Sequence, residues 1–148
     1  MTYTIDIIVE DDVSLSDTTV EQTVLFALEA TDTPPGEVSI SFVSDETIRA
    51  LNKQYRDLDE PTDVLSFAQE EEGFIFHPTR VLGDIVISLE TMQRNALLFD
   101  VEPDVELKRL LIHGVLHLLG HDHQTNGEDE EMLLLQEEIL RNLLRSTD

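Results

Sequence analysis

The chain of 148 residues has the length of one domain, and its 41% hydrophobic and 28% charged residues are ordinary for a globular protein, which excludes the disordered and fibrous classes. The absence of cysteine excludes disulfides and thiolate zinc sites, so histidine and carboxylate are the strong metal ligands that remain. The formal net charge of -23 argues against nucleic acid as a partner, although seven of the nine basic residues lie between Arg49 and Arg109, where they would form a local cationic patch.

The N-terminus carries acidic residues where a secretory signal carries positive charge, and no apolar run has the length of a membrane span. A cytoplasmic location is therefore expected, with no membrane partner.

Apolar residues recur along most of the chain, either at every second position or at helical spacing, and turn or capping residues bound each segment. In chain order these patterns predict a strand at residues 3–9, a helix from Ser16 or Asp17 to Pro34, a strand at 38–42, a helix from Ser44, strands at 64–67 and 81–89, a helix from Ser88 or Glu90 through Leu98, a helix from Pro103 to Gly120, and a last helix after Gly127. Because we find no repeat and no linker, we expect one α+β domain over residues 1–148, in which a mixed sheet of about four strands packs with helices.

The helix predicted to end at Gly120 is apolar around most of its circumference, which is typical of a buried helix. His113 and His117 interrupt this surface, and their spacing of one turn places them on the same face, about 6 Å apart along the axis. Gly120 favours a left-handed helix end, after which the chain turns back and brings His123 toward the other two. Three histidines leave one position for water, so the spacing predicts a catalytic site for one Zn²⁺ per chain held by His113, His117 and His123.

A lone histidine in such a place is more often a hydrogen-bonded core residue or an exposed one, and we keep that interpretation for His77 and His121. Three histidines at ligand spacing favour the metal instead. The spacing also matches the long metalloprotease motif, so a zincin-like metal helix is expected. In that motif a glutamate follows the first histidine and acts as the general base, whereas here Gly114 takes its place, which argues against a protease.

Four segments resemble, in order and in spacing, the conserved blocks of the YbeY family, bacterial metal-dependent endoribonucleases of rRNA maturation. The segments are residues 51–56 (LNKQYR), 61–67 (PTDVLSF), 82–88 (LGDIVIS) and 113–123 (HGVLHLLGHDH). The resemblance runs from about Ser39 to His123, while the first strand and helix match only in pattern.

The resemblance implies cleavage of single-stranded RNA, processing of rRNA termini, notably the 3′ end of the small-subunit rRNA, and ribosome quality control. It implies that the three histidines are zinc ligands and that Arg56 is a catalytic or substrate-binding arginine. A guanidinium suits this role because it holds a phosphate through two hydrogen bonds. The residues alone favour a surface ion pair of Arg56 with Asp57 or Asp59. The expected partners are RNA and the ribosome or a ribosomal protein, and no DNA.

Asp84 begins a buried-looking strand, where it would be a structural turn residue or, alternatively, would orient a ligand imidazole. The leading hypothesis is a zinc-dependent endoribonuclease. The general base is not identified, and attack by water and by a ribose 2′-hydroxyl both stay open. The alternatives are a zinc hydrolase of a small ester or amide, and a non-catalytic ribosome-assembly factor whose zinc is structural.

Overall fold

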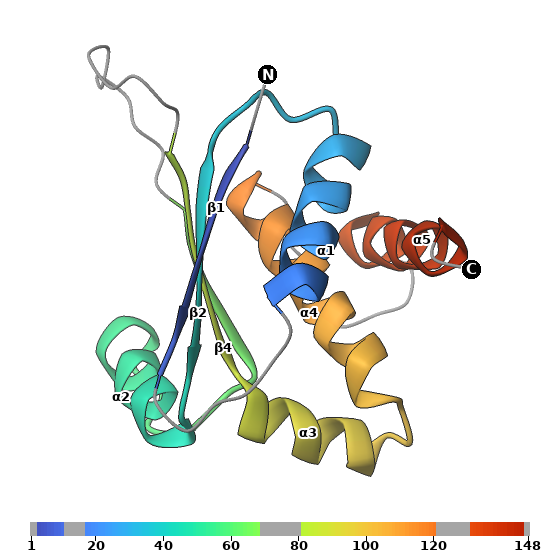
Figure 1. Cartoon of the computed structure of the whole chain (residues 1–148). Coiled ribbons are helices and arrows are strands. Elements are labelled where there is room, and N and C mark those ends of the chain that lie inside the picture. Colours follow the sequence, from blue (N-terminus) through green and yellow to red (C-terminus); the bar gives the residue numbers. More distant parts are fainter. Residues whose placement is uncertain (1–2, 11–16, 69–80, 121–130, 147–148) are drawn as a thin grey trace.

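The computed structural model describes residues 3–10, 17–68, 81–120 and 131–146, and within them a four-stranded sheet carries helices on both faces (Figure 1). The elements in chain order are β1 (Thr4–Val9), α1 (Asp17–Ala30), β2 (Glu37–Val43), α2 (Asp45–Arg56), β3 (Val64–Ala68), β4 (Val81–Ser88), α3 (Leu89–Leu98), α4 (Pro103–Leu118) and α5 (Glu131–Ser146). Each strand and helix predicted from the patterns is present in these ranges. The start of the last helix relative to Gly127 lies outside the described residues.

The strand order is β1-β2-β4-β3, so β3 lies at an edge of the sheet. β1 and β2 are parallel, β2 and β4 are parallel, and β3 runs antiparallel to β4. The expected α+β class and mixed sheet are therefore confirmed. α1 and α4 cover one face, α5 packs outside them against α4, and α2 covers the opposite face (Figure 1).

The helix ends follow from local chemistry. The hydroxyl of Ser44 caps α2 by accepting a hydrogen bond from the backbone N–H of Thr47, and Ser88 caps α3 in the same way. Pro103 occupies the first turn of α4, where its missing N–H costs no helical hydrogen bond. Gly120 follows α4 with a φ of +94°, in the left-handed region that glycine adopts without strain. The predicted starts of these helices and the left-handed conformation of Gly120 are therefore confirmed, while the predicted course of the chain from Gly120 to His123 lies outside the described residues.

The backbone of α4 packs closely against the side chains of β4, which buries the helix. A Cβ atom on Gly114 would lie 2.8 Å from Cγ2 of Ile85, so the helix and the strand touch where a larger residue would separate them. Near the C-terminal end of α4, a Cβ atom on Gly83 would lie 2.8 Å from Cδ2 of Leu118. These two contacts set the height of α4 above the sheet, and with it the position of the histidines on that helix.

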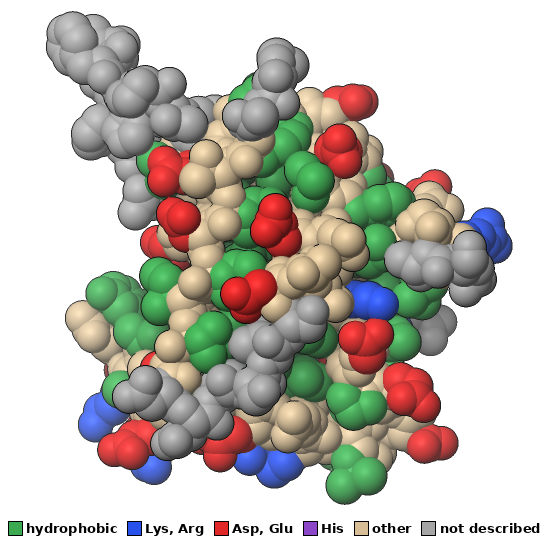
Figure 2. Space-filling view, viewed as in Figure 1, with side chains coloured by type: hydrophobic (Ala, Val, Ile, Leu, Met, Phe, Trp, Pro, Cys, Tyr) green, Lys and Arg blue, Asp and Glu red, His purple; other side chains and the backbone are tan. Residues whose placement is uncertain are grey.

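Acidic side chains are spread over the face of the molecule drawn in Figure 2, in keeping with the net charge of -23. Among the described helices, none is long and apolar enough to cross a membrane.

Candidate metal centre

The rings of His113 and His117 meet on one face of α4. Their Nε2 atoms are 3.1 Å apart, and the ring centroids are 4.6 Å apart with the planes inclined by 68°. Two imidazole nitrogens that bind one tetrahedral zinc ion, each at about 2.0–2.1 Å, are roughly 3.3 Å from one another. The two Nε2 atoms therefore converge at close to the separation that a shared ion requires.

His123, the third predicted ligand, lies outside the described residues, as do His77 and His121. Within the part of the chain that the structure describes, no third His, Cys, Asp or Glu joins the pair to make a three-ligand group. The described geometry thus contains two of the three predicted ligands.

The paired histidines open into a cavity of about 220 Å³ between α4, the edge strand β3 and the C-terminal end of α2. Ser66 pairs with Ile85 across β3 and β4, and Ile85 faces α4, so Ser66 lies on the same side of the sheet as the histidines. The lining combines hydrogen-bonding groups with an apolar floor: Asn52, Arg56, Leu58, Val64, Leu65, Ser66, His113 and His117. The cavity places an arginine beside the candidate metal ligands.

Arg56 is held at the rim of this cavity by the edge strand. Its Nη2 donates a hydrogen bond to the backbone oxygen of Ser66 at 3.1 Å. The nearby carboxylate of Asp59 pairs with Arg49 instead, at 2.8 Å. Among the described residues, the surface ion pair of Arg56 with Asp57 or Asp59 is therefore not formed, and the guanidinium stays beside the histidines.

The turn after α2 explains why Arg56 and Leu58 reach the cavity together. Asp57 adopts a left-handed conformation with a φ of +61° and caps the helix by donating its N–H to the backbone oxygen of Asn52. The buried side chain of Asn52 then donates from Nδ2 to the backbone oxygen of Glu60 at 2.9 Å. One asparagine thus ties the end of α2 to the segment that folds back toward β3.

Gln136 of α5 contacts His113, one of the two candidate metal ligands on α4, and the sequence patterns did not single it out. Nδ1 of His113 lies 2.6 Å from Oε1 of Gln136, whose side chain is buried with 6% of its surface exposed. The available signal was the position of Gln136 in the buried stripe of α5, four residues after Met132 and three before Ile139. A polar residue in such a stripe needs a hydrogen-bonding partner, which here is a histidine.

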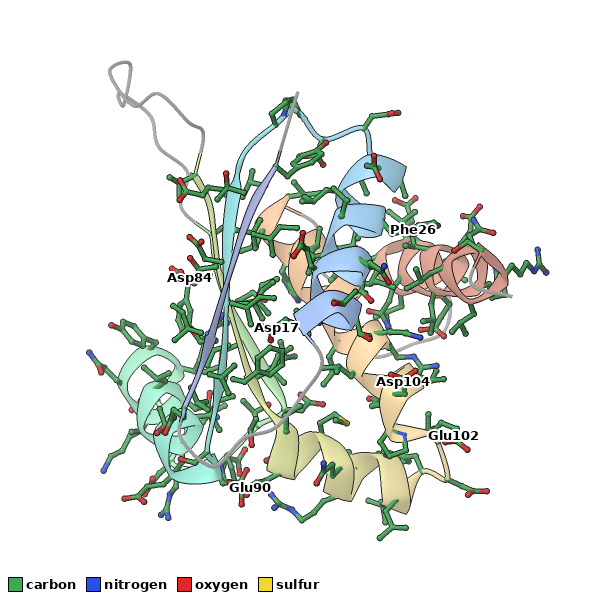
Figure 3. The ribbon with its side chains drawn as sticks, in the orientation of Figure 1. Asp17, Phe26, Asp84, Glu90, Glu102 and Asp104 are labelled. Atoms are coloured by element: carbon green, nitrogen blue, oxygen red, sulfur yellow. The ribbon has the colours of Figure 1, made fainter. Side chains whose placement is uncertain are left out.

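Among the described residues, Asp84 does not orient the imidazole of His113 or His117. It alternates along β4 with Ile85, which faces Gly114 of α4, so its side chain lies on the opposite face, away from α1 and α4 (Figure 3). It is also not a turn residue, because it pairs with Phe67 inside the sheet. Partial burial raises the pKa of its carboxyl above the ordinary value. The predicted turn role of Asp84 is therefore wrong, as is the role of orienting His113 or His117, while a contact with His123 lies outside the described residues.

Nearly the whole chain is similar to known proteins. A family model described as "Endoribonuclease YbeY" matches residues 6–144. A protein of Treponema denticola with the name Endoribonuclease YbeY is 53% identical over 106 residues, which cover 70% of this chain and 68% of the relative. A protein of Chloroflexus aggregans with the same name is 38% identical over 149 residues, which cover 97% of each chain. The solution structure of TM1509 from Thermotoga maritima is similar with a TM-score of 0.65 and 30% identity, covering 97% of this chain and 93% of that one.

Proposed function

This chain belongs to the endoribonuclease YbeY family, and we propose that it is an endoribonuclease that cleaves single-stranded RNA during rRNA maturation, at the 3′ end of the small-subunit rRNA, and in ribosome quality control. The observation that carries the proposal is the convergence of the two Nε2 atoms in a cavity that Arg56 also lines. The family match over residues 6–144 supports the proposal that residues 1–148 act as one domain.

The proposed cofactor is one Zn²⁺ per chain, held by His113, His117 and His123. The donor chemistry supports this, because neutral imidazole is a preferred zinc ligand and the chain has no cysteine to compete. When bound, the ion would polarise a phosphoryl oxygen of the substrate.

Arg56 is the proposed catalytic residue that holds the scissile phosphate. Its present acceptor is the neutral backbone oxygen of Ser66, and a phosphate forms stronger, charge-assisted hydrogen bonds with a guanidinium. The guanidinium would also offset negative charge that grows on the phosphate in the transition state. Its place at the cavity rim supports contact with a strand that enters toward the histidines.

The surface around α2 supports RNA binding by a chain that is acidic elsewhere. α2 contains three basic and two acidic residues. Tyr55, which precedes Arg56 at the end of α2, is 58% exposed, and its ring meets that of Phe67 edge-on, with ring centroids 5.2 Å apart. An exposed aromatic residue and a cation on the same helix end suit an unpaired base and its phosphate. We propose that the ribosome or a ribosomal protein, in the cytoplasm, delivers the strand to this surface against the negative net charge.

Cleavage of an end-labelled single-stranded RNA tests the function. We expect Arg56→Ala to lower kcat/KM by about 10²–10³-fold, as removal of one charge-stabilising donor does. The matched control is Arg49→Ala, which removes the same charge from the same helix at a residue that pairs with Asp59, and we expect a loss below about tenfold. Chelation should abolish cleavage, and added zinc should restore it.

Cleavage that survives both chelation and Arg56→Ala would come from a contaminating nuclease and would contradict the proposal. Ribosome binding without RNA cleavage, retained in His113→Ala, would favour the assembly-factor alternative. The ends of the RNA products distinguish attack by water from attack by a ribose 2′-hydroxyl. Attack by water leaves no cyclic phosphate, whereas attack by the 2′-hydroxyl leaves a 2′,3′-cyclic phosphate.

A further inference from the structure

Four side chains from α4 and α5 form a hydrogen-bonded chain that ends on the ring of His113. Arg109 donates to both carboxylate oxygens of Glu137, from Nε at 2.9 Å and from Nη2 at 3.2 Å. Nε2 of Gln136 donates to Oε2 of Glu137 at 3.0 Å, and Oε1 of Gln136 lies 2.6 Å from Nδ1 of His113. The chain therefore runs from a cation, through a carboxylate and an amide, to a candidate metal ligand.

The charges and hydrogen-bonding groups of these four side chains determine where each proton lies. Burial opposes the ionisation of Glu137, but the hydrogen bonds from Arg109 and Gln136 outweigh it, so the pKa of Glu137 lies below its ordinary value. An ionised carboxylate only accepts hydrogen bonds, so the NH₂ group of Gln136 must face Glu137. The amide oxygen then faces His113, and because this oxygen also only accepts, Nδ1 of His113 must carry the proton.

We propose that Gln136 is a positioning residue that holds His113 in the tautomer protonated at Nδ1, so that Nε2 presents its lone pair toward His117 and the cavity. Only this tautomer offers Nε2 as a ligand, and the hydrogen bond also fixes the rotation of the ring. Gln136 thereby prepares one ligand for the ion, and this inference rests on the proposed function.

If Gln136 only filled space in the core, it would not need hydrogen bonds to two specific partners. A buried glutamine that only fills the space between two helices would be replaced well by methionine, which has a similar volume. Here the amide joins two specific partners, and the ion pair of Arg109 with Glu137 fixes its orientation. Arg109 is itself anchored by a second carboxylate, Glu106, which does not contact Gln136.

Two measurements on the full-length protein test the proposal. Nitrogen-15 NMR of the histidine rings, recorded with and without zinc, reports the tautomer of His113. Competition with a chelating dye reports the dissociation constant of zinc. In Gln136→Met we expect a mixture of tautomers without zinc and a zinc affinity about 10–100-fold weaker than in wild type. Gln136→Glu keeps an acceptor oxygen at this place, so the Nδ1 proton should remain and the affinity should change by less than about tenfold.

Two further variants separate positioning from packing. Glu137→Gln lets the amide of Gln136 turn over, so it should weaken zinc binding in the same direction as Gln136→Met. The matched control is Glu106→Gln, which removes the other partner of Arg109 and should leave tautomer and affinity unchanged. If Gln136→Met fails to fold, Gln136→Glu and Glu137→Gln still decide the question.

An unchanged tautomer and an unchanged zinc affinity in Gln136→Met and Glu137→Gln would overturn the inference. If the wild type binds no zinc, the proposed metal site fails, while the tautomer comparison in the zinc-free protein still decides whether Gln136 positions His113. The two failures are therefore distinguishable.

Discussion

Gly114 packs so closely against the side chain of Ile85 that α4 and the central strand β4 leave no room for a Cβ atom between them. That atom would lie 2.8 Å from Cγ2 and 2.9 Å from Cδ1 of Ile85. Ile85 is fully buried and β-branched, so it has little freedom to move away. The residue that directly follows His113 is thus a glycine for a packing reason.

We expect Gly114→Ala to lower the free energy of unfolding by up to about 2 kcal/mol, because overpacking of the core costs about 1–3 kcal/mol and alanine regains roughly 1 kcal/mol of helix propensity. Urea unfolding of the variant and of wild type measures the difference. In an Ile85→Ala background, which removes the contacting atoms, the same substitution should become neutral or stabilising. An increase in stability in the wild-type background would show that helix propensity outweighs the contact.

Asp45 links the start of α2 to α3 and should make the fold sensitive to acid. It accepts hydrogen bonds from Ser88 and Thr91 and pairs with Arg94 at 2.7 Å. Burial opposes its ionisation, but these partners outweigh burial and lower the pKa of Asp45. Because the folded pKa is the lower one, the carboxylate stabilises the fold above its unfolded pKa, and this stabilisation is lost as the pH falls through the folded pKa.

We therefore expect Asp45→Asn to lower the free energy of unfolding by about 1–2 kcal/mol at pH 7. The difference from wild type should shrink as the pH falls below about 4. Denaturant unfolding at a series of pH values measures it, and a difference that stays constant with pH would contradict the electrostatic explanation.

Asp84 should show the opposite pH dependence. Burial raises the pKa of its carboxyl, so the ionised form is less favourable in the folded protein than in the unfolded chain. Asp84→Asn should then be more stable than wild type at pH 7, and the gain should disappear as the pH falls through the raised pKa. The same pH series tests this, with Asp45→Asn as the comparison of opposite sign.

Zinc should stabilise the folded chain through the three predicted ligands. At a free zinc concentration of 100 times the dissociation constant, binding adds about 2.7 kcal/mol, which corresponds to an increase in Tm of roughly 5–10 °C. Metal analysis should find one zinc per chain in wild type, and neither the zinc nor the shift in Tm in His113→Ala, His117→Ala or His123→Ala. A His123→Ala variant that keeps its zinc with unchanged affinity would exclude His123 as a ligand.

Tyr55 should contribute to RNA binding by stacking. Tyr55 is 58% exposed, and a stacked base does not need its hydroxyl. Tyr55→Ala should weaken binding of a single-stranded RNA by about 1–3 kcal/mol, whereas Tyr55→Phe should bind nearly as wild type does. Fluorescence anisotropy with labelled RNA measures both variants. Equal affinities of Tyr55→Ala and wild type would place the bound strand elsewhere.

Local features of this chain were readable from its sequence because they depend on neighbours a few residues away. The spacing of His113 and His117 put both rings on one face of a helix, since the helical repeat is the same wherever a helix packs. The caps at Ser44 and Ser88 and the left-handed Gly120 likewise depend on adjacent backbone groups. Alternating apolar residues located the strands for the same reason.

Which surfaces meet was decided only by the tertiary structure. The placement of β3 at the edge beside β4 brought Arg56 to the histidines, and no periodicity encodes a strand order. Gln136 contacts His113, 23 positions away in the sequence, because α5 packs on α4. The prediction for Asp84 failed because the environment of a strand residue depends on what covers each face of the sheet. Period and capping are set by local sterics, whereas these contacts arise from the burial of apolar faces, which many arrangements of the same elements would satisfy.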